Sequence, residues 1–254
     1  MSDRRQLWRI AAKAALRCGS DSRGSSTGIH TILFRTGRLP QRPITAYLRE
    51  LTKKGITFDY HNTMPFTIDG KLRSGVFELE GDVSSQYVTG LLFALPLLDG
   101  DSEIRMLSKL ESKPYVDLTI ACLRHFGIAV QETEQGYAVA GGQQYHACDL
   151  TVEGDYSQAA FFCVANALGS DITLTNLNPE SVQGDKKIVE IVREMCYNRE
   201  QGLPAGFTVD AADIPDLVPI LAVLATFGTA PSSITGAHRL AIKESDRLAS
   251  TATC

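Results

Sequence analysis

One structural unit occurs three times in this sequence, and that repetition constrains the fold more than any other feature. Each copy has an extended apolar stretch, an acidic or polar turn, a helix-like apolar stretch, a second strand and a basic or polar turn. The copies lie at residues 77–115, 151–186 and 208–247. Internal repeats indicate an architecture built from one supersecondary unit. Because each copy places polar residues at the same two turns, we expect one face to gather polar side chains from several copies.

The composition is that of an ordinary globular chain. The 254 residues are 44% hydrophobic and 21% charged, which is close to the average for soluble domains. One or two domains are expected at this length. The net charge of -4 gives no overall case for a nucleic acid or an anionic membrane as partner. No apolar run approaches the ~20 residues that a membrane span needs, so we expect neither kind of partner.

The cysteines and histidines are too scattered to indicate a metal or disulfide framework. There are six cysteines and five histidines, without a C-x-x-C pair or a His-x-x-x-His motif. We therefore predict reduced thiols in the cytoplasm and no structural metal. The six cysteines are Cys18, Cys122, Cys148, Cys163, Cys196 and Cys254.

Residues 1–28 differ in character from the rest and are treated as a separate N-terminal segment. They begin with a basic stretch of helical periodicity and end in a Ser/Gly-rich loop. A transit peptide is an alternative, which Asp3 and Asp21 disfavour. Two domains are expected to follow, at 29–150 and 151–254, because the Glu-Gly-Asp sequence at 80–82 recurs at 153–155.

Helix and strand signals alternate through both expected domains. Periodicity and the positions of Gly and Pro predict helices at 42–51, 84–98, 114–126, 157–167, 185–196, 216–227 and from 247 onward. Strands are predicted at 30–35, 56–60, 66–68, 76–79, 128–130, 137–139 and 150–152.

The Ser84-Ser85-Gln86 turn is a candidate anion site. It joins a strand to a helix, where unpaired backbone N–H groups and the helix dipole favour an anion. Serine hydroxyls and a Gln amide can add donors around a phosphate. A simple helix cap explains the same residues equally well.

Several other charged residues can be interpreted either as ligand or catalytic groups or as ordinary structural charges. They lie near the second strand of the third copy and at two helix starts. Lys243 and Arg247 are four apart, so a helix would place them on one face as an anion clamp. Glu244 between them could exchange a proton, although a salt-bridged helix start is the common alternative. Arg42 before a proline is equally ambiguous. Asp216 is a helix cap unless a substrate hydroxyl reaches it, in which case it is a general base.

Six short motifs in a fixed order resemble one enzyme family. The sequence from about Gly28 to the C-terminus is similar to the 3-phosphoshikimate 1-carboxyvinyltransferase (5-enolpyruvylshikimate-3-phosphate synthase) family. That resemblance implies the enolpyruvyl-transferase fold, of class α/β (α+β), with repeated β-α-β-α-β-β units in two domains, the second of them truncated here. The motifs are Gly81-Asp82-Val83-Ser84-Ser85-Gln86, Ser112-Lys113-Pro114-Tyr115-Val116-Asp117, Val152-Glu153-Gly154-Asp155, Gln183-Gly184-Asp185, Asp213-Ile214-Pro215-Asp216 and Lys243-Glu244-Ser245-Asp246-Arg247.

The resemblance also implies an activity and its partners. It implies transfer of enolpyruvyl from phosphoenolpyruvate to the 5-hydroxyl of shikimate 3-phosphate, with release of phosphate, in the shikimate pathway to chorismate and the aromatic amino acids. The two substrates are the expected partners. No metal or organic cofactor is implied, and we expect a cytoplasmic monomer.

Site residues follow from the matched positions. Asp216 resembles the proton acceptor for the attacking hydroxyl, and Glu244 the proton donor to the enol carbon. For shikimate 3-phosphate the resemblance implies contacts from Ser84, Ser85, Gln86, Ser112, Tyr115, Asp216 and Lys243. For phosphoenolpyruvate it implies Arg42, Gln86 and Arg247.

Two other functions stay open at this point. One is the related enolpyruvyl transfer to a nucleotide sugar, which the Ser-Ser-Gln and Ser-Lys-Pro-Tyr motifs fit less well. The other is a non-catalytic module that binds anions or shikimate 3-phosphate without turnover. Members of the family are longer and have further Lys and Arg ligands before and after the matched region. We therefore expect an incomplete site at both ends and no measurable turnover from these 254 residues alone.

Overall fold

The computed structural model describes residues 31–33, 44–61, 66–242 and 245–253. Contacts divide this part of the chain between Asp149 and Leu150 into two compact units, called unit 1 and unit 2 below. Each unit has its own hydrophobic core. Among the described helices, none is both long and apolar enough to cross a membrane.

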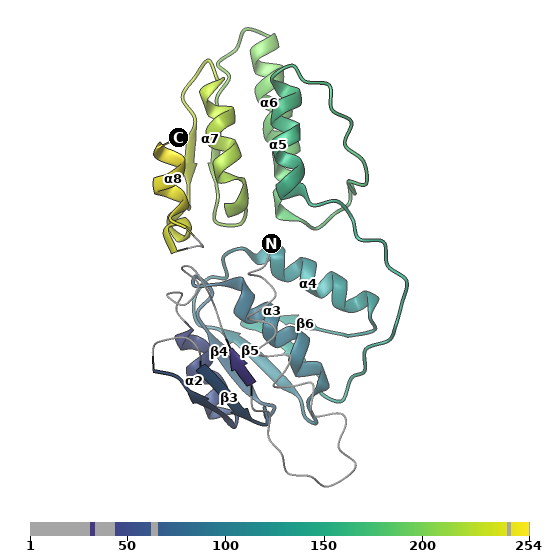
Figure 1. Cartoon of the computed structure of the whole chain (residues 1–254). Coiled ribbons are helices and arrows are strands. Elements are labelled where there is room, and N and C mark those ends of the chain that lie inside the picture. The colour runs from purple at the N-terminus through teal and green to yellow at the C-terminus, as the bar shows by residue number, and fades with distance from the viewer. Residues whose placement is uncertain (1–30, 34–43, 62–65, 243–244, 254) are drawn as a thin grey trace. The chain divides into compact units, whose positions relative to one another are not determined.

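The described part of unit 1 contains two sheets and three α-helices (Figure 1). Its elements are β1 (Thr31–Leu33), α2 (Thr45–Lys53), β2 (Ile56–Asp59), β3 (Phe66–Gly70), β4 (Val76–Leu79), α3 (Ser85–Ala94), a 3₁₀ turn (Leu95–Leu97), β5 (Ser102–Met106), α4 (Lys113–His125), β6 (Gln131–Thr133) and β7 (Gly136–Val139).

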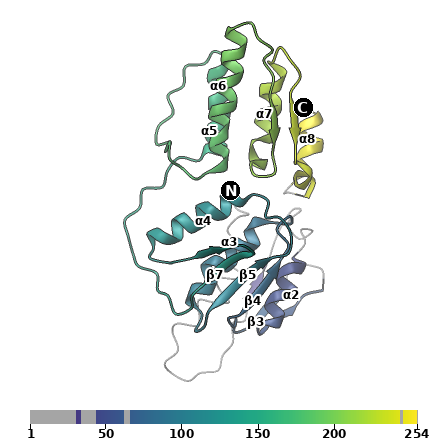
Figure 2. The same ribbon diagram turned by 180° about the vertical axis from the view of Figure 1, so that it is seen from behind.

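The larger sheet of unit 1 has strand order β4-β5-β7-β6, and the smaller sheet has order β1-β3-β2. In the larger sheet β4 and β5 are parallel, whereas β7 runs antiparallel to both of its neighbours. Helices α3 and α4 lie together on one face of this sheet, as the views from both sides show (Figures 1 and 2). The run from β4 to β7 is therefore one complete β-α-β-α-β-β unit, which the sequence predicted.

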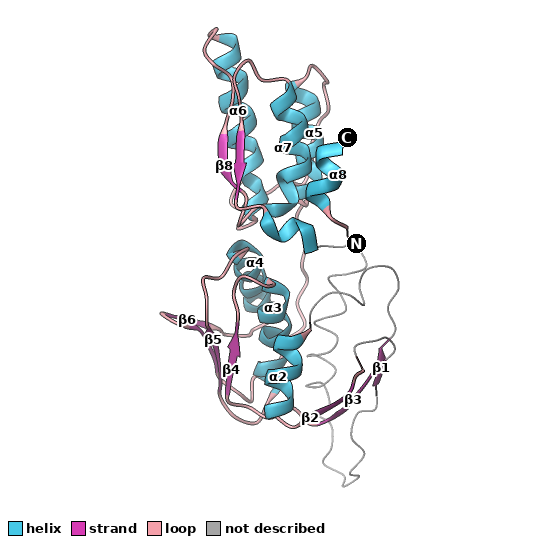
Figure 3. Ribbon diagram, turned by 90° about the vertical axis from the view of Figure 1, so that its left-hand side faces the viewer, coloured by secondary structure: helices cyan, strands magenta, loops and turns pink. Residues whose placement is uncertain are grey.

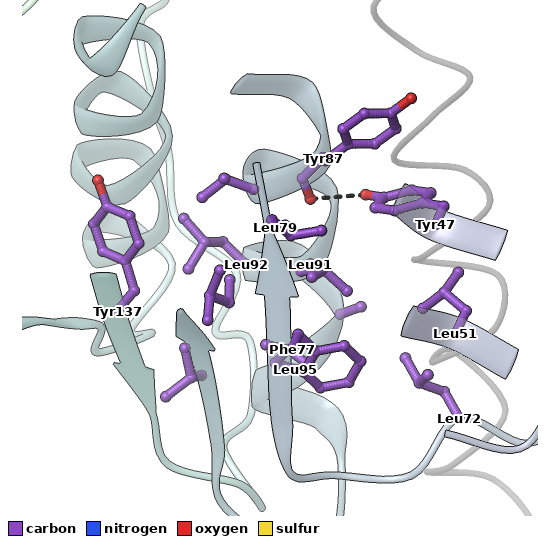
Figure 4. Packing of buried hydrophobic residues seen from close by; sticks show 14 of the residues in the cluster. Tyr47, Leu51, Leu72, Phe77, Leu79, Tyr87, Leu91, Leu92, Leu95 and Tyr137 are labelled. Atoms are coloured by element: carbon purple, nitrogen blue, oxygen red, sulfur yellow. Dashed lines mark hydrogen bonds between the residues drawn. The ribbon is translucent and has the colours of Figure 1, made fainter. Parts of the chain in front are cut away.

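The core of unit 1 lies where α2 and α3 pack on β4. Tyr47 and Leu51 from α2 point toward Phe77 of β4 and Leu91 of α3 (Figure 4). These side chains are at most 1% exposed. The Tyr47 hydroxyl donates to the backbone oxygen of Tyr87, 2.8 Å away, so its one polar group is satisfied inside the core. Helix α2 is thus fixed firmly against β4.

Unit 2 is mainly helical (Figure 3). Strands β8 and β9 form a two-stranded parallel sheet. The elements are α5 (Tyr156–Ala167), a 3₁₀ turn (Gly184–Lys186), α6 (Lys187–Glu200), β8 (Thr208–Asp210), a 3₁₀ turn (Pro215–Leu217), α7 (Val218–Thr226), β9 (Ser233–Thr235), a 3₁₀ turn (His238–Ile242) and α8 (Arg247–Thr253).

Two predicted strands are wrong. The strand expected at 128–130 begins instead at Gln131, because the amide of Ile128 caps the preceding helix by donating to the Leu123 oxygen at 3.0 Å. The strand expected at 150–152 is not formed. There the side-chain amide of Asn176 donates to the backbone oxygen of Val152, and the Val152 side chain stays 77% exposed.

In two of the copies a hydrogen bond joins the first turn to the second. In the first copy Glu111 donates its amide to the Gly81 oxygen at 3.1 Å. In the second, the side-chain amide of Gln183 donates to the Gly154 oxygen at 2.9 Å. In the third, the Ala211 amide donates to the Thr235 oxygen at 2.8 Å, which continues the pairing of β8 with β9. The second copy therefore preserves a pair of adjacent turns even though its first strand is lost.

Candidate functional site

The two polar turns of unit 1 follow the carboxyl ends of strands β4 and β5 of its larger sheet. Because these strands are parallel, with Leu79 opposite Met106, their carboxyl ends lie on the same side of the sheet, and α3 and α4 begin there. Ligands of α/β sheets bind preferentially at the carboxyl ends of parallel strands. The helices also touch along their length, since the hydroxyls of Thr89 and Thr119 are 3.2 Å apart. Two helix N-termini are therefore neighbours.

The turn before α3 carries three of the expected contacts. Ser84 is the N-cap, and its hydroxyl accepts the Gln86 amide at 3.3 Å. The cap that the sequence offered as an alternative is thus present. Ser85 is buried, at 9% exposed. The side-chain oxygen of Gln86 is buried without a hydrogen-bond partner, and buried polar atoms without partners are rare. This unsatisfied atom marks the start of α3 as a place that suits a polar ligand.

The turn before α4 holds Ser112 in a strained conformation. Its φ of 57° and ψ of 35° are left-handed, and this region costs a non-glycine residue about 1–2 kcal/mol. Ser112 is 2% exposed, and its backbone oxygen accepts the Tyr115 amide at 3.1 Å. Strain of this kind is found at sites where the surrounding structure fixes the backbone for function.

The two turns are interlocked through Gly81 and Ser108. The Gly81 amide donates to the Ser108 hydroxyl at 2.9 Å, and that hydroxyl donates to Asp82 at 2.9 Å. Ser108 was not among the expected site residues, because nothing near it in the chain signals a contact with a turn 27 positions earlier. The backbone is also too close at Gly81 for any side chain, since an added Cβ would lie 2.6 Å from the Lys109 oxygen.

Lys113 is a second residue that the sequence analysis left outside the site. It opens α4, and its ammonium group contacts Asp117 at 2.7 Å and Glu132 at 3.3 Å. Burial lowers the pKa of Lys113, but the hydrogen bonds that its ammonium group donates to Asp117 and Glu132, together with the charge of Asp117, outweigh burial and make the net shift upward. Lys113 therefore stays charged beside the two helix N-termini.

In unit 2 the structure brings Asp216 and Arg247 together. Asp216 lies in the 3₁₀ turn that precedes α7, and Arg247 is the first residue of α8. Their side chains form an ion pair of 2.8 Å and are 16% and 28% exposed, respectively. Strands β8 and β9 are parallel, so α7 and α8, which follow them, both start on the side of the carboxyl ends of these strands. The arrangement holds a partly buried carboxylate in a fixed orientation.

The expected residues thus fall into two groups. Unit 1 holds Ser84, Ser85, Gln86, Ser112 and Tyr115, whereas unit 2 holds Asp216 and Arg247. Arg42, Lys243 and Glu244 lie outside the described residues. Within the part of the chain that the structure describes, no three His, Cys, Asp or Glu side chains cluster as metal ligands would.

Comparisons with known proteins give one consistent result. The family model of EPSP synthase (3-phosphoshikimate 1-carboxyvinyltransferase) matches residues 30–254. A 3-phosphoshikimate 1-carboxyvinyltransferase of Clostridium novyi is 43% identical over 228 residues, which are 85% of this chain and 52% of the relative. That of Clostridium kluyveri is 44% identical over 223 residues, or 84% of this chain and 52% of the relative. The chain spans about half the length of the curated relatives it matches.

Solved structures confirm the expected fold class. EPSP synthase from Acinetobacter baumannii superposes with a TM-score of 0.67 at 20% identity, over 98% of this chain and 58% of that one. The enolpyruvyl transferase NikO from Streptomyces tendae gives a TM-score of 0.52 at 15% identity, over 78% of this chain and 50% of that one. At these identities the likeness establishes the fold, which is α/β and of the enolpyruvyl-transferase type.

Proposed function

The chain belongs to the EPSP synthase family, and we propose that it acts in the transfer of enolpyruvyl from phosphoenolpyruvate to the 5-hydroxyl of shikimate 3-phosphate. In this reaction the hydroxyl oxygen bonds to the enol carbon that bears the phosphate, and phosphate leaves. The step belongs to the shikimate pathway, which leads to chorismate and the aromatic amino acids. Both substrates carry several negative charges, so their site needs donors and cations.

The observation that carries this proposal is the interlocked pair of helix starts in unit 1. We assign Ser84, Ser85, Gln86, Ser112 and Tyr115 to shikimate 3-phosphate. The hydroxyls, the Gln86 amide and the backbone N–H groups of two helix N-termini offer a phosphate many donors within one small region. The buried side-chain oxygen of Gln86 without a partner supports the assignment, because a sugar-like ring with hydroxyl groups would satisfy it.

The chemical step is assigned to unit 2. Asp216 accepts the proton of the 5-hydroxyl, and Glu244 protonates the methylene carbon of phosphoenolpyruvate, because addition across an enol needs a separate base and acid. When phosphate leaves, the same methylene carbon gives up a proton, which restores the double bond of the enolpyruvyl group. Lys243 and Arg247 offset the charge that moves during addition, with Lys243 on shikimate 3-phosphate and Arg247 on phosphoenolpyruvate. Arg42 and Gln86 complete the phosphoenolpyruvate contacts. The 2.8 Å ion pair between Arg247 and Asp216 supports a base whose orientation is fixed.

Titration calorimetry with shikimate 3-phosphate tests the binding assignment. Ser85→Ala should weaken binding about tenfold or more, because a hydrogen bond to a charged group contributes about 1.5–3 kcal/mol. Ser102→Ala is the matched control. Ser102 is a buried serine of the same unit, but it lies at the other end of β5, where its hydroxyl accepts the Gly75 amide. Equal affinity of the wild type and Ser85→Ala would contradict the assignment.

A second pair of measurements separates this function from the two alternatives, enolpyruvyl transfer to a nucleotide sugar and a non-catalytic binding module. Displacement of bound shikimate 3-phosphate by a nucleotide sugar, with tighter binding of the latter, would favour the related transferase. Phosphate release from phosphoenolpyruvate in the presence of shikimate 3-phosphate distinguishes catalysis from binding alone. Where turnover is present, Asp216→Asn and Glu244→Gln should each reduce it about 100-fold or more. Binding without turnover would identify a non-catalytic module.

A cytoplasmic location is part of the same proposal. Cys122, Cys148, Cys163 and Cys196 are all unpaired thiols, which is the usual state of cysteines in a reducing compartment. Fractionation of cells that express the chain tests this location.

A further inference from the structure

A network of charged side chains joins α2 to the free edge of β4. Its centre is Glu50, a carboxylate that is only 1% exposed. One carboxylate oxygen accepts from Arg49 and from Lys53, each at 2.8 Å. The other oxygen accepts the backbone amide of Glu78 at 3.1 Å. A buried carboxylate needs this many partners, since burying an unpaired charge is very costly.

Arg49 extends the network along β4. Its guanidinium donates to the backbone oxygen of Glu78 at 2.7 Å. Both backbone polar groups of Glu78 are therefore bonded by side chains of α2. In the described sheet β4 is the terminal strand, and such an edge normally exposes unpaired backbone groups. Helix α2 therefore binds this edge at Glu78, which fixes the register between the helix and the strand.

The same guanidinium reaches one step further, to Glu80. Two of its nitrogens donate to the two carboxylate oxygens of Glu80, at 2.7 and 3.2 Å. This fork geometry is specific to arginine. Hydrogen bonding from Arg49 lowers the pKa of Glu80, so both partners are charged. Glu80 immediately precedes Gly81, where the turn to Ser84 begins.

The turn between β4 and α3 is consequently held from two sides. On one side Gly81 bonds to Ser108 and Glu111 of the following turn. On the other side Arg49 holds Glu80. Along the sequence, α2 starts three positions after Arg42, the candidate phosphoenolpyruvate contact. The helix that carries Arg49 is thus joined, through that side chain, to the turn of the serine donors.

We propose that Arg49 is a positioning residue of the substrate site, acting through Glu80 and the backbone of Glu78 to set where α3 begins. Arg49 contacts no substrate in this scheme. The proposal rests on the function proposed above for the Ser84–Gln86 turn. The alternative is an ordinary surface ion pair, since Arg49 and Glu80 are 37% and 34% exposed. Exposed pairs contribute little to global stability, so a positioning role must be sought in local order and binding.

Hydrogen exchange of the ligand-free chain tests the positioning itself. We compare Arg49→Met with Lys53→Met as matched control. Each variant removes one cation from the same Glu50 carboxylate, but only the first also severs the contacts to β4 and Glu80. The amides at 81–86 should exchange at least about threefold faster in Arg49→Met and at the wild-type rate in Lys53→Met, because local opening follows local contacts. Equal exchange in both variants overturns the proposal.

Affinity for shikimate 3-phosphate tests the consequence for the site. We expect a loss of about fivefold to tenfold for Arg49→Met and for Arg49→Lys, which keeps the charge but not the fork. Lys53→Met should bind as the wild type does. Glu80→Gln should weaken binding alone but add nothing to Arg49→Met, since both act through one contact; if Arg49→Met does not fold, Glu80→Gln replaces it in both experiments.

The outcomes distinguish this proposal from the function on which it rests. Faster exchange at 81–86 with unchanged affinity overturns the role of Arg49 in the site while the proposed function stands. Equal losses of affinity in the Arg49 and Lys53 variants overturn it as well. A wild-type chain that does not bind shikimate 3-phosphate refutes the proposed function, and the exchange experiment then decides the positioning claim by itself.

Discussion

The close approach of the two turns at Gly81 gives the sharpest stability prediction. In Gly81→Ala the added Cβ would lie 2.6 Å from the Lys109 oxygen and 2.7 and 2.8 Å from the Cα and N of Leu110. All three are backbone atoms, so no side-chain rotation relieves the contact. The turns must separate, and the hydrogen bonds from Gly81 to Ser108 and from Glu111 to Gly81 lengthen or break.

These contacts set how far the free energy of unfolding should fall in Gly81→Ala. Each of the two hydrogen bonds contributes about 0.5–1.5 kcal/mol, and overpacking a closed site costs about 1–3 kcal/mol. The lower chain entropy of alanine in the unfolded state offsets about 0.4–1 kcal/mol. We expect the free energy of unfolding of unit 1 to fall by about 3 kcal/mol. Binding of shikimate 3-phosphate should weaken too, because the turn carries Ser84 and Ser85.

Hydrogen exchange of the slowest amides in β4 and β5 is the appropriate assay, since it reports the unfolding of one unit rather than of the whole chain. Gly100→Ala is the control. Its Cβ would meet only the rotatable hydroxyl of Ser74 at 2.6 Å and the Ser74 Cβ at 3.5 Å, so we expect a change within about 1 kcal/mol. If Gly81→Ala loses less than about 1 kcal/mol, or no more than Gly100→Ala, the two turns are not interlocked as described.

Three other residues should affect stability and binding in different ways. Burial raises the pKa of Glu50, but hydrogen bonds from two cations and a strand amide outweigh burial and lower the pKa below 4.5. The free energy of unfolding should therefore hold above pH 4.5 and decline as the pH falls below it. The decline should be less steep in Glu50→Gln, as urea titrations from pH 3 to 7 would show. Parallel pH curves would count against this. Ser112→Gly relieves a φ of 57° and should keep or raise the melting temperature while weakening shikimate 3-phosphate binding; a less stable variant that binds normally would contradict it. Arg239 is 5% exposed and donates to the Ala212 oxygen at 2.9 Å, so Arg239→Met should lower the free energy of unfolding of unit 2 by about 1.5–3 kcal/mol and speed exchange in the turn before Asp216; unchanged exchange there would refute the link.

Much of the local structure could be predicted from the sequence. The helices of both units were expected near their observed positions, because apolar periodicity and the positions of Gly and Pro act within one element. Gly127 shows the limit of such signals. It marked the end of α4 correctly, but its capping bonds extend to Ile128 and displace the next strand by three residues, from 128 to 131. Motif order alone sufficed for the family, since each short motif is weak but six in sequence are specific.

The sequence therefore determined the elements, the family and the residue types of the candidate site. Only the tertiary structure decided which of these residues are neighbours. The parallel pairing of β4 with β5 places Ser84 beside the turn of Ser112, and the fold brings Arg49 to Glu80 across 31 positions of sequence. Such contacts depend on strand register and on the packing of a shared core, and closing the long loops between them has no signature in the local residues. For the same reason the left-handed backbone of Ser112 was hidden from the sequence, because surrounding contacts rather than its own preferences hold it there.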